Sequence, residues 1–526
     1  MPPAPVNKWI VALSVTFGTL MGTIDASIVN VAVPHLRAGV GATVEQITWI
    51  STGFIIATVL VMPLTAFLGR MFGQKRVYLF CLALFVAGSA LCGMARSLEA
   101  LVLFRFVQGF GAGALQPTEQ AILRQTFPPH EQGMAMALFG MAVMIGPALG
   151  PTLGGYIVDH YSWPWIFYIN LPVGVLGFFM VSRFVHEPPD IAAANRAVAE
   201  KQRKHMDWAG IALLSAGLGS LQYMLEEGNA KDWFQSHLIQ GALLVSAFAL
   251  TAFVIRELTA TAPVVNLRLF KDRVFLSGTL VSSVMFAILF SITFLLPLFM
   301  QMLLGYSAVQ SGLTLMPRTL IMMVVTPIIG KLYNKLSPRV VVGFGICMFA
   351  VAAWQMSHFT LSTSAANIIG SLLVQGIGFA CLFVPLTTVS LSSVKRSNLA
   401  DATGLNSLFR QVGGSIGLAV FATLLSRQTT AANAALAEHV TATDLATALR
   451  LTQIQAWLGS QGLDPASAKT ASLGVLAGIV RRQAMVLSFE KLFLIAGILF
   501  LCVLPLLLFL KADRPARPGP QGDLSH

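Results

Sequence analysis

The chain has 526 residues, of which 56% are apolar and only 11% are charged, and its formal net charge is +12. Soluble domains carry roughly a quarter charged residues, so this composition excludes an ordinary globular protein and indicates an integral membrane protein. A positive charge also suits nucleic-acid binding, but basic residues of membrane proteins collect in cytoplasmic loops, which explains the charge without a nucleic-acid partner.

Long apolar runs recur along the chain. A helix needs about 20 apolar residues to cross a bilayer, and the sequence predicts an all-α integral membrane protein from these runs. The fourteen predicted spans are 9–33, 47–68, 77–96, 99–121, 134–158, 164–184, 207–227, 236–256, 274–303, 309–331, 339–360, 365–390, 404–427 and 488–511.

Basic residues test the number of spans independently. When the N-terminus is placed in the cytoplasm, 22 of the 34 Lys and Arg residues fall in cytoplasmic segments and three fall in short outer loops. Loss of one helix would invert half of this distribution. The sequence therefore predicts an even number of spans with both termini cytoplasmic.

A weak repeat divides the chain. Short basic turns follow the second and the tenth runs, at 69–76 and 330–335. Repeated halves that enclose a midplane site are typical of transporters. We expect a six-helix bundle at 1–206, a two-helix insert at 207–256, and a second six-helix bundle at 257–526. Residues 428–487 are predicted to be a long outer loop carrying short helices, which is either a docking site for a partner or a surface cap.

Two charges lie deep in predicted spans. Asp25 is in the first span and Arg105 is in the fourth, at similar depths. Charges inside lipid are costly and usually face a bundle interior. We expect the two side chains to pair, and we interpret Asp25 as a carboxylate that takes up and releases a proton beside Arg105. A permanent structural ion pair remains the alternative.

The fourth span carries further polar and small residues. Gln108 and Gly109 share the helical face of Arg105, and Gly109 and Gly113 have the spacing of a close-packed helix seam. Glu119 lies nearly four turns beyond Arg105, close to the same face. It is predicted to be a second proton site near the cytoplasm, with a gating or capping role as the alternative.

Glycine and proline are dense in the fifth span. Such residues bend a helix in lipid and let neighbouring helices approach closely. We expect a moving seam rather than a static kink. Its residues are Gly140, Gly146, Pro147, Gly150, Pro151, Gly154 and Gly155.

Three other charges are candidates for a substrate cavity or gate. Glu226 ends the seventh span beside Glu227, and adjacent residues do not share a helix face, so at most one faces a cavity. Arg318 lies near mid-membrane and Arg410 lies near the inner end of the thirteenth span. Each arginine either attracts an anionic group or balances a carboxylate, and the sequence leaves both possibilities open.

The sequence contains no motif for nucleotide binding, metal binding or nucleophilic catalysis. There is no phosphate-binding GxxxxGK[ST] loop, no metal-ligand spacing and no nucleophile triad. The five cysteines lie in apolar runs without a CxxC pair, which favours packing over disulfides. We therefore expect neither an enzyme nor a cofactor.

Together these motifs resemble the major facilitator superfamily, and within it the fourteen-helix drug:proton antiporters of the EmrB/QacA type. Residues 25–34, which include Asn30, are similar to the first-helix motif, and residues 105–113 are similar to the helix-four motif. Residues 146–155 resemble the helix-five antiporter motif, and residues 165–172 resemble the entry to helix six. Residues 219–222, 232–234 and 385–388 are similar to the EmrB branch.

The resemblance covers nearly the whole chain and departs from the family in one loop. After the second helix the family has Gly and an acidic residue where this chain has Ala66 and Arg70, although Gly73, Lys75 and Arg76 are retained. The sequence therefore does not predict the inner-gate contact that the acidic residue makes in the family.

The resemblance implies a fold and a function. The fold is the major-facilitator fold, with fourteen helices arranged as six, two and six. The function is export of hydrophobic or amphiphilic small molecules from the bacterial inner membrane by alternating access, driven by the proton motive force and with Arg105 linked to coupling. EmrB-type members work with a periplasmic membrane-fusion adaptor and an outer-membrane channel. The alternative is a transporter of one metabolite, fatty acid or siderophore-like compound.

Overall fold

The computed structural model describes residues 7–189, 191–193, 195, 199, 207–260, 263–333, 335–441 and 444–509. Within these residues the chain forms helices and turns without a strand. Thirteen helices are long and apolar enough to cross a membrane, and a bent pair supplies a fourteenth span. This arrangement confirms the predicted all-α fold with fourteen spans.

The bent pair corrects one predicted span. The apolar run at 47–68 predicts a continuous helix, but the axis turns by 56° between α3 (Trp49–Val61) and α4 (Thr65–Phe72). The turn contains Pro63. Proline has no backbone N–H and disfavours helical geometry at the residue before it, so the helix breaks there.

The first part of the chain packs into an N-terminal group around α6. α6 contacts α1, α3, α5 and α7. The helices of this group are α1 (Lys8–Val40), α2 (Val44–Ile47), α3, α4, α5 (Gln74–Met94), α6 (Leu98–Thr126), η1 (Pro129–Glu131), α7 (Gln132–His160), α8 (Trp165–Tyr168) and α9 (Asn170–Phe184).

A C-terminal group packs around α13, α16 and α17. Its helices are η3 (Leu267–Lys271), α13 (Arg273–Met302), α14 (Ala308–Leu332), α15 (Pro338–Met356), α16 (Ala365–Val389), η4 (Arg396–Asn398), α17 (Leu399–Glu438), α18 (Leu445–Ser460), α19 (Pro465–Leu501) and η5 (Leu504–Phe509). α7 and α14 lie side by side and join the two groups.

Two insert helices, α11 (Trp208–Glu227) and α12 (His237–Thr259), are linked by η2 (Trp233–Gln235). α11 packs on α3 of the N-terminal group and on α17 of the C-terminal group. Gln222 donates a hydrogen bond of 2.7 Å to Ser415 of α17, and Tyr223 stacks on Trp49 of α3. The insert therefore bridges the two groups. The predicted boundary at residue 206 lies outside the described residues.

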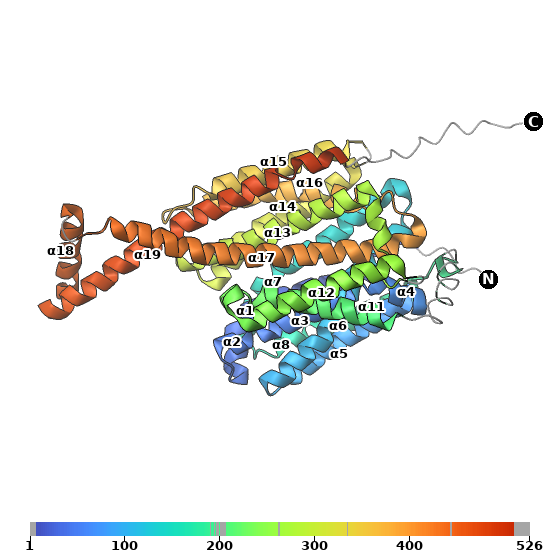
Figure 1. Ribbon diagram of the computed structural model, residues 1–526, viewed down its shortest axis with the longest axis horizontal. Helices are drawn as coiled ribbons and strands as arrows, with labels where there is room; N and C mark the ends of the chain where they lie inside the picture. The colour runs from blue at the N-terminus through green and yellow to red at the C-terminus, as the bar shows by residue number, and fades with distance from the viewer. Residues whose placement is uncertain are drawn as a thin grey trace, which may run out of the picture.

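The segment 428–487 differs from the expected loop of short helices. α17 and α19 continue through most of it as unbroken helices, and α18 packs across α19. Figure 1 shows these three helices projecting from the bundle as an extension. The 40-residue α17 is far longer than a bilayer requires, which accounts for the projection.

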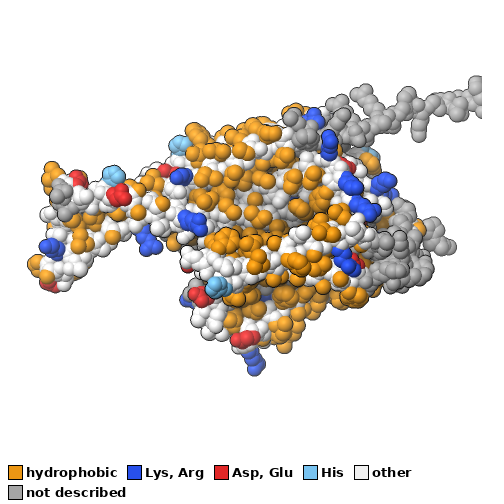
Figure 2. Space-filling model, in the orientation of Figure 1, with side chains coloured by type: hydrophobic (Ala, Val, Ile, Leu, Met, Phe, Trp, Pro, Cys, Tyr) orange, Lys and Arg blue, Asp and Glu red, His pale blue; other side chains and the backbone are white. Residues whose placement is uncertain are grey.

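Side-chain types follow the position along the bundle. Figure 2 shows a broad hydrophobic surface over the bundle helices. The end opposite the extension contains the helix termini that carry Arg70, Lys75 and Arg124 and the short helix η4 with Arg396, and we call it the basic end (Figure 1). Lys8, at the start of α1, also lies there, in an ion pair of 2.5 Å with Glu131. The chain therefore has one end that carries charged turns and one that carries the extension.

Candidate functional site

The N-terminal group contains a buried charge cluster. Asp25 of α1 and Arg105 of α6 are 0% and 1% exposed, and an Asp25 carboxylate oxygen lies 2.6 Å from Nη1 of Arg105. The pairing expected from their similar depths is confirmed. Arg105 also donates through Nε to the backbone carbonyl of Ile50, at 3.2 Å. Its guanidinium lies 4.1 Å from the centroid of the Phe54 ring.

Three neutral side chains complete this cluster. Gln108 and Asn170 each donate to the second oxygen of Asp25, at 2.9 Å. Both amides also donate to the hydroxyl of Ser89, at 3.2 and 3.0 Å. Gln108 accepts a further hydrogen bond from Arg105. Gln108 therefore belongs to the charge cluster.

The geometry makes Asp25 well compensated. Two charges in a low-dielectric interior are tolerated when they pair and when the remaining lone pairs are hydrogen-bonded, and both conditions hold here. Removing one partner of a buried pair typically costs about 3–5 kcal/mol, because the other charge is left uncompensated. Any event that neutralises Asp25 therefore changes the stability of contacts among α1, α6 and α9 (Asn170 begins α9).

Glu119 is buried on a different part of α6. It is 0% exposed, and one of its carboxylate oxygens accepts a hydrogen bond of 3.1 Å from Thr16 of α1. Its second oxygen has no hydrogen-bond partner among the residues that the structure describes. The structure therefore buries Glu119 inside the N-terminal group, whereas the alternative gating or capping role places it in solvent at a membrane end.

The glycines of α6 explain how closely it approaches its neighbours. A Cβ added at Gly109 would lie 2.5 Å from the carbonyl oxygen of Phe54, and one added at Gly113 would lie 2.5 Å from that of Thr58. Both neighbours belong to α3. The predicted close-packed seam is therefore present between α6 and α3, where it helps to hold Arg105 under the Phe54 ring.

The Gly/Pro segment of α7 has two faces. Gly146, Gly150 and Gly154 contact α1 so closely that an added Cβ would meet Thr23, Ser27 and Ile28. On other faces Gly140 lies against Phe383 of α16, and Gly155 lies against Val309 of α14. Pro147 is exposed, and Pro151 lies beside Gly312 of α14. The segment thus joins α1 to the C-terminal group, and its motion remains a prediction.

The C-terminal group also buries charge, but without counterions among the described residues. Arg318 of α14 and Arg410 of α17 are 6% and 4% exposed. Arg318 is 3.4 Å from the hydroxyl of Thr293 and 3.3 Å from the amide oxygen of Gln375, and its Nε makes no hydrogen bond there. Arg410 donates to Ser407 at 3.0 Å, and its Nη1 makes none within the same residues.

Aromatic rings surround Arg410. Its guanidinium is 5.7 Å from the ring of Phe139 and 5.5 Å from that of Phe286. Phe379 and Phe383 of α16 stack with centroids 5.6 Å apart, and each lies 6.3 Å from Phe286. Phe139 belongs to α7, so Arg410 lies where the two groups meet. Cation–π contacts offset burial of an arginine only partly, at about 0.5–2 kcal/mol each.

The two groups are joined by polar contacts at the basic end. Arg70 of α4 pairs with Asp401 in the first turn of α17 at 2.5 Å, with side chains 12% and 5% exposed. Arg124 of α6 donates to the backbone carbonyls of Thr388 and Leu391, at 3.2 and 2.7 Å. The structure thus shows a contact that the sequence did not predict: the basic residue at the family's acidic position meets a carboxylate from the other group.

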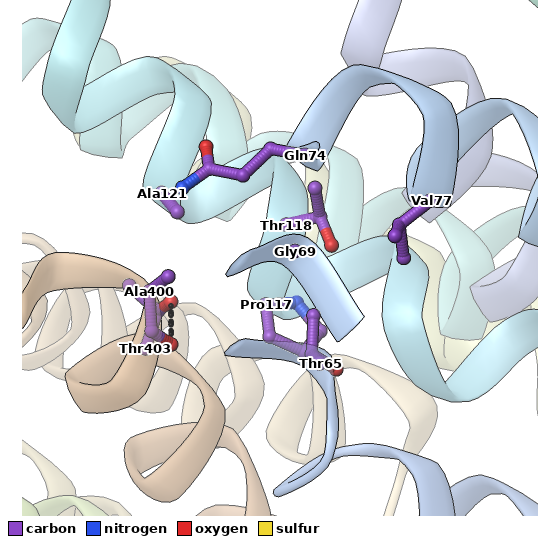
Figure 3. A pocket seen from close by; sticks show the side chains of 9 residues that line it. All are labelled: Thr65, Gly69, Gln74, Val77, Pro117, Thr118, Ala121, Ala400 and Thr403. Atoms are coloured by element: carbon purple, nitrogen blue, oxygen red, sulfur yellow. Dashed lines mark hydrogen bonds between the residues drawn. The ribbon is translucent and has the colours of Figure 1, made fainter. Parts of the chain in front are cut away.

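A small cavity lies in the same interface. Figure 3 shows it between the N-terminal helices and the start of α17, where Ala400 and Thr403 lie. Its lining comes from α4, α5, α6 and α17, and every lining side chain except that of Gln74 is small or short. The lining residues are Thr65, Gly69, Gln74, Val77, Pro117, Thr118, Ala121, Ala400 and Thr403.

The remaining predicted residues lie elsewhere. Asn30 is exposed on α1, away from the charge cluster formed by Asp25. Glu226 accepts a hydrogen bond from Gln222 in α11. In the loop motif, Gly73 has a φ of +89°, which favours a residue without a Cβ. Lys75 donates to the carbonyl of Ser182 at 2.7 Å, and Arg76 is exposed.

Sequence reasoning missed several residues that the structure brings to these sites. Ser89 and Asn170 support Asp25, Asp401 pairs with Arg70, and Gln375 meets Arg318. All four are polar residues within apolar helices or at their ends, which is the signal that would have found them. Their partners are distant in sequence, so spacing alone does not identify the pairs.

Sequence comparisons agree with this architecture. Residues 15–418 match the family model of the Major Facilitator Superfamily. The fatty acid resistance protein FarB of Neisseria gonorrhoeae is 34% identical over 95% of this chain and 96% of its own length. The multidrug export protein EmrB of Escherichia coli K12 is 33% identical over 98% of this chain and 97% of its own length.

Solved structures share the fold. The proton:xylose symporter XylE superposes with a TM-score of 0.60 at 13% identity, covering 93% of this chain and 94% of that chain. The human organic anion transporter MFSD10 gives a TM-score of 0.57 at 16% identity, covering 95% and 100%. At such identities only the fold is shared. The family match and the full-length relatives show that the chain is a membrane transporter of the Major Facilitator Superfamily, akin to its EmrB-type export proteins.

Proposed function

We propose that this protein is a proton-coupled exporter of hydrophobic or amphiphilic small molecules that works by alternating access between the N-terminal and C-terminal groups. The observation that carries the proposal is the buried cluster of Asp25 and Arg105. Intramembrane carboxylates that face the interior of a helix bundle are typical of proton relays in pumps and transporters. Export is supported by relatives that are named for multidrug export.

We place the basic end in the cytoplasm and the extension outside it. The support is the concentration of Lys and Arg in the turns of the basic end, which follows the positive-inside rule. In a bacterium this orientation puts the protein in the inner membrane and the extension in the periplasm. Under this assignment, the contacts of Arg70 and Arg124 close the cytoplasmic side in the present conformation.

The coupling step that we propose is supported by the contacts of Asp25. A proton that arrives from outside neutralises Asp25 and removes the charge that Arg105 pairs with. The contacts of Gln108 and Asn170 with the carboxylate also weaken, because hydrogen bonds to a charged acceptor are stronger than those to a neutral one. α1 carries both Asp25 and the tight contacts to α7, and α7 lies beside α14. Protonation therefore biases the packing between the groups.

Glu119 is the second proton site in this scheme. In this conformation it accepts a hydrogen bond from Thr16, and no cation contacts it among the described residues. We propose that it is protonated here and loses its proton to the cytoplasm when that side opens. Asp25 and Glu119 both lie where α6 faces α1, so the two sites are carried by the same helix pair.

Transport in proteoliposomes tests the function. Purified protein is reconstituted with a pH indicator inside the vesicles and is given a fluorescent amphiphile, and a pH gradient is imposed. We expect substrate to move against the proton flux and transport to stop when nigericin collapses the gradient. Transport that ignores the gradient contradicts proton coupling, and uptake in the direction of proton flow contradicts antiport.

A narrower substrate range is the second candidate. One relative, FarB, is named for fatty acid resistance, which supports export of fatty acids or similar compounds as the alternative to broad multidrug export. An efflux screen in a pump-deficient strain distinguishes the two. Protection from many unrelated compounds supports the broad function, and protection confined to amphiphilic acids supports the narrow one.

We also propose that the extension contacts a periplasmic membrane-fusion adaptor, which in turn reaches an outer-membrane channel. The support is exposed apolar side chains on helices that project beyond the bundle (Figure 1). Leu445, Leu449 and Trp457 of α18 are 73%, 56% and 56% exposed. Site-specific photocrosslinking from Leu449, compared with the exposed membrane position Phe248 of α12, tests this contact in cells that contain the adaptor. Equal crosslinking from both positions contradicts it.

A further inference from the structure

The C-terminal group buries two arginines, and its membrane-spanning helices offer few acidic residues that could pair with them. From residue 273 to residue 400 the sequence contains neither Asp nor Glu, so α13, α14, α15 and α16 supply no carboxylate. On α17 the acidic residues are Asp401, which pairs with Arg70, and Glu438 at the far end of the helix. Arg318 and Arg410 therefore remain without an acidic partner among the described residues.

Each arginine also has an unused hydrogen-bond donor. Nε of Arg318 and Nη1 of Arg410 are buried and make no hydrogen bond within the part of the chain that the structure describes. Buried polar atoms in native proteins are nearly always satisfied, so an unsatisfied donor on a buried cation points to a ligand. A guanidinium suits a carboxylate or another oxyanion, because its planar fork matches the paired oxygens.

Aromatic residues separate the two arginines. Gln375, which meets Arg318, lies one turn before Phe379 on α16, and Phe379 stacks on Phe383. Both rings contact Phe286, and Phe286 lies against Arg410. These aromatic rings therefore lie between the guanidinium groups of Arg318 and Arg410. An amphiphile that has an apolar body and a negative head group is complementary to this arrangement of rings and cations.

We propose that Arg318 and Arg410 bind the head group of an anionic amphiphile, a carboxylate on an apolar body, and that this compound is the transported substrate. The second clause rests on the proposed function. Lipophilic cations are disfavoured by the same two charges, and a neutral compound leaves the charges uncompensated. Since Arg410 touches Phe139 of α7, the ligand lies where the N-terminal and C-terminal groups separate during transport.

Binding of a matched acid and ester tests the proposal. The probes are 11-(dansylamino)undecanoate and its methyl ester, titrated against the full-length protein in phosphatidylcholine nanodiscs, with empty nanodiscs subtracted. We expect the acid to bind at least about tenfold more tightly than the ester, the size of effect that one charge-assisted contact provides. Equal binding of the two probes to the wild type overturns the proposal.

Variants locate the site. Arg318→Gln and Arg410→Gln are expected to abolish the preference for the acid while leaving ester binding within about twofold. Arg318→Lys and Arg410→Lys keep the charge and should retain part of the preference. The matched control is Arg427→Gln, which removes an exposed arginine from the same helix as Arg410. Retention of the full preference in Arg318→Gln and Arg410→Gln overturns the proposal.

Two further comparisons distinguish a substrate from a lipid, and acid binding from proton coupling. In nanodiscs rich in phosphatidylglycerol, unchanged binding of the acid supports a substrate site. Loss of that binding indicates that a lipid head group occupies the arginines, and it overturns the proposal.

Transport of tetraphenylphosphonium tests the proposed function separately. Gradient-driven export of this cation together with absent acid binding overturns the inference alone. Acid binding with export that ignores the pH gradient overturns proton coupling alone.

Discussion

The two groups of helices bury charge in opposite ways. In the N-terminal group, Arg105 pairs with Asp25, and Gln108 and Asn170 satisfy the rest of the carboxylate. In the described part of the C-terminal group, Arg318 and Arg410 have polar contacts but no acid, and each retains an unused donor. A paired cluster changes when a proton arrives, whereas an unpaired cation changes when an anion arrives. Our proposals therefore assign proton handling to the N-terminal group and substrate handling to the C-terminal group.

Loss of Asp25 is expected to give the largest effect. Asp25→Asn leaves Arg105 buried without its counterion, so unfolding stability should fall by about 3–5 kcal/mol. The double variant Asp25→Asn with Arg105→Gln removes both charges and should recover most of that loss. Thermal unfolding in detergent measures both variants. Equal stability of the single variant and the wild type would break the comparison, because it would mean that the pair is not a compensated unit.

Removing an arginine that has no acidic partner should raise the unfolding stability, whereas loss of Asp25 should lower it. Arg318→Gln or Arg410→Gln deletes a buried charge without an acidic partner among the described residues, so the ligand-free protein should gain about 1–3 kcal/mol of stability. The same unfolding assay measures the change, with Arg427→Gln as an exposed control near zero. Marked destabilisation by both variants would contradict the assignment, since it would indicate that the arginines already serve a structural partner.

Close packing between α1 and α7 provides a test of intermediate size. A methyl group at Gly146 meets the backbone of Thr23, whereas one at Gly155 lies at 3.4 Å from Val309. Gly146→Ala should therefore destabilise the protein by about 1–3 kcal/mol through overpacking. Gly155→Ala, on the face toward α14, should have a small effect. Similar effects in both variants would show that the two faces of α7 do not differ in tightness.

The ion pair between Arg70 and Asp401 provides a test of how the two groups are held together at the basic end. Arg70→Asp places like charges opposite each other and should open this end, raising the reactivity of a cysteine introduced at Ala400 about tenfold, a shift of about 1.4 kcal/mol. Exchanging both charges, with Arg70→Asp and Asp401→Arg, should restore the protected state. If the exchange does not restore protection, the ion pair does not hold the groups together.

The sequence predicts the buried charges but not most of their surroundings. The depth of Asp25 and Arg105 follows from helix rise, so their pairing is predictable. The roles of Asn170 and Ser89 are not, because their contacts depend on how α9 and α5 approach α1. Pro63 signals the bend in the second span, but the apolar run around it favours a continuous helix. The exposed position of Asn30 and the burial of Glu119 depend on helix rotation, which apolar runs do not specify.

The extension shows the same limit. Its composition indicates a surface segment with helical stretches. The continuity of α17 and α19 through it is not predictable from hydropathy, because a long helix that leaves the membrane loses its apolar character without ending. Asp464 and its bonds to Ala466 and Ser467 mark the start of α19, a capping pattern that is visible in the sequence.

The division of labour between the groups is tested most directly by comparing two transport modes of Asp25→Asn. Substrate counterflow requires binding and alternation but no net proton movement, whereas gradient-driven export requires coupling. With decanoate as substrate in proteoliposomes, the variant should retain counterflow within about threefold of the wild type, a change of less than about 0.7 kcal/mol, and should lose acceleration by a pH gradient. Loss of decanoate counterflow together with decanoate binding, or an undiminished response to the gradient, would contradict the account.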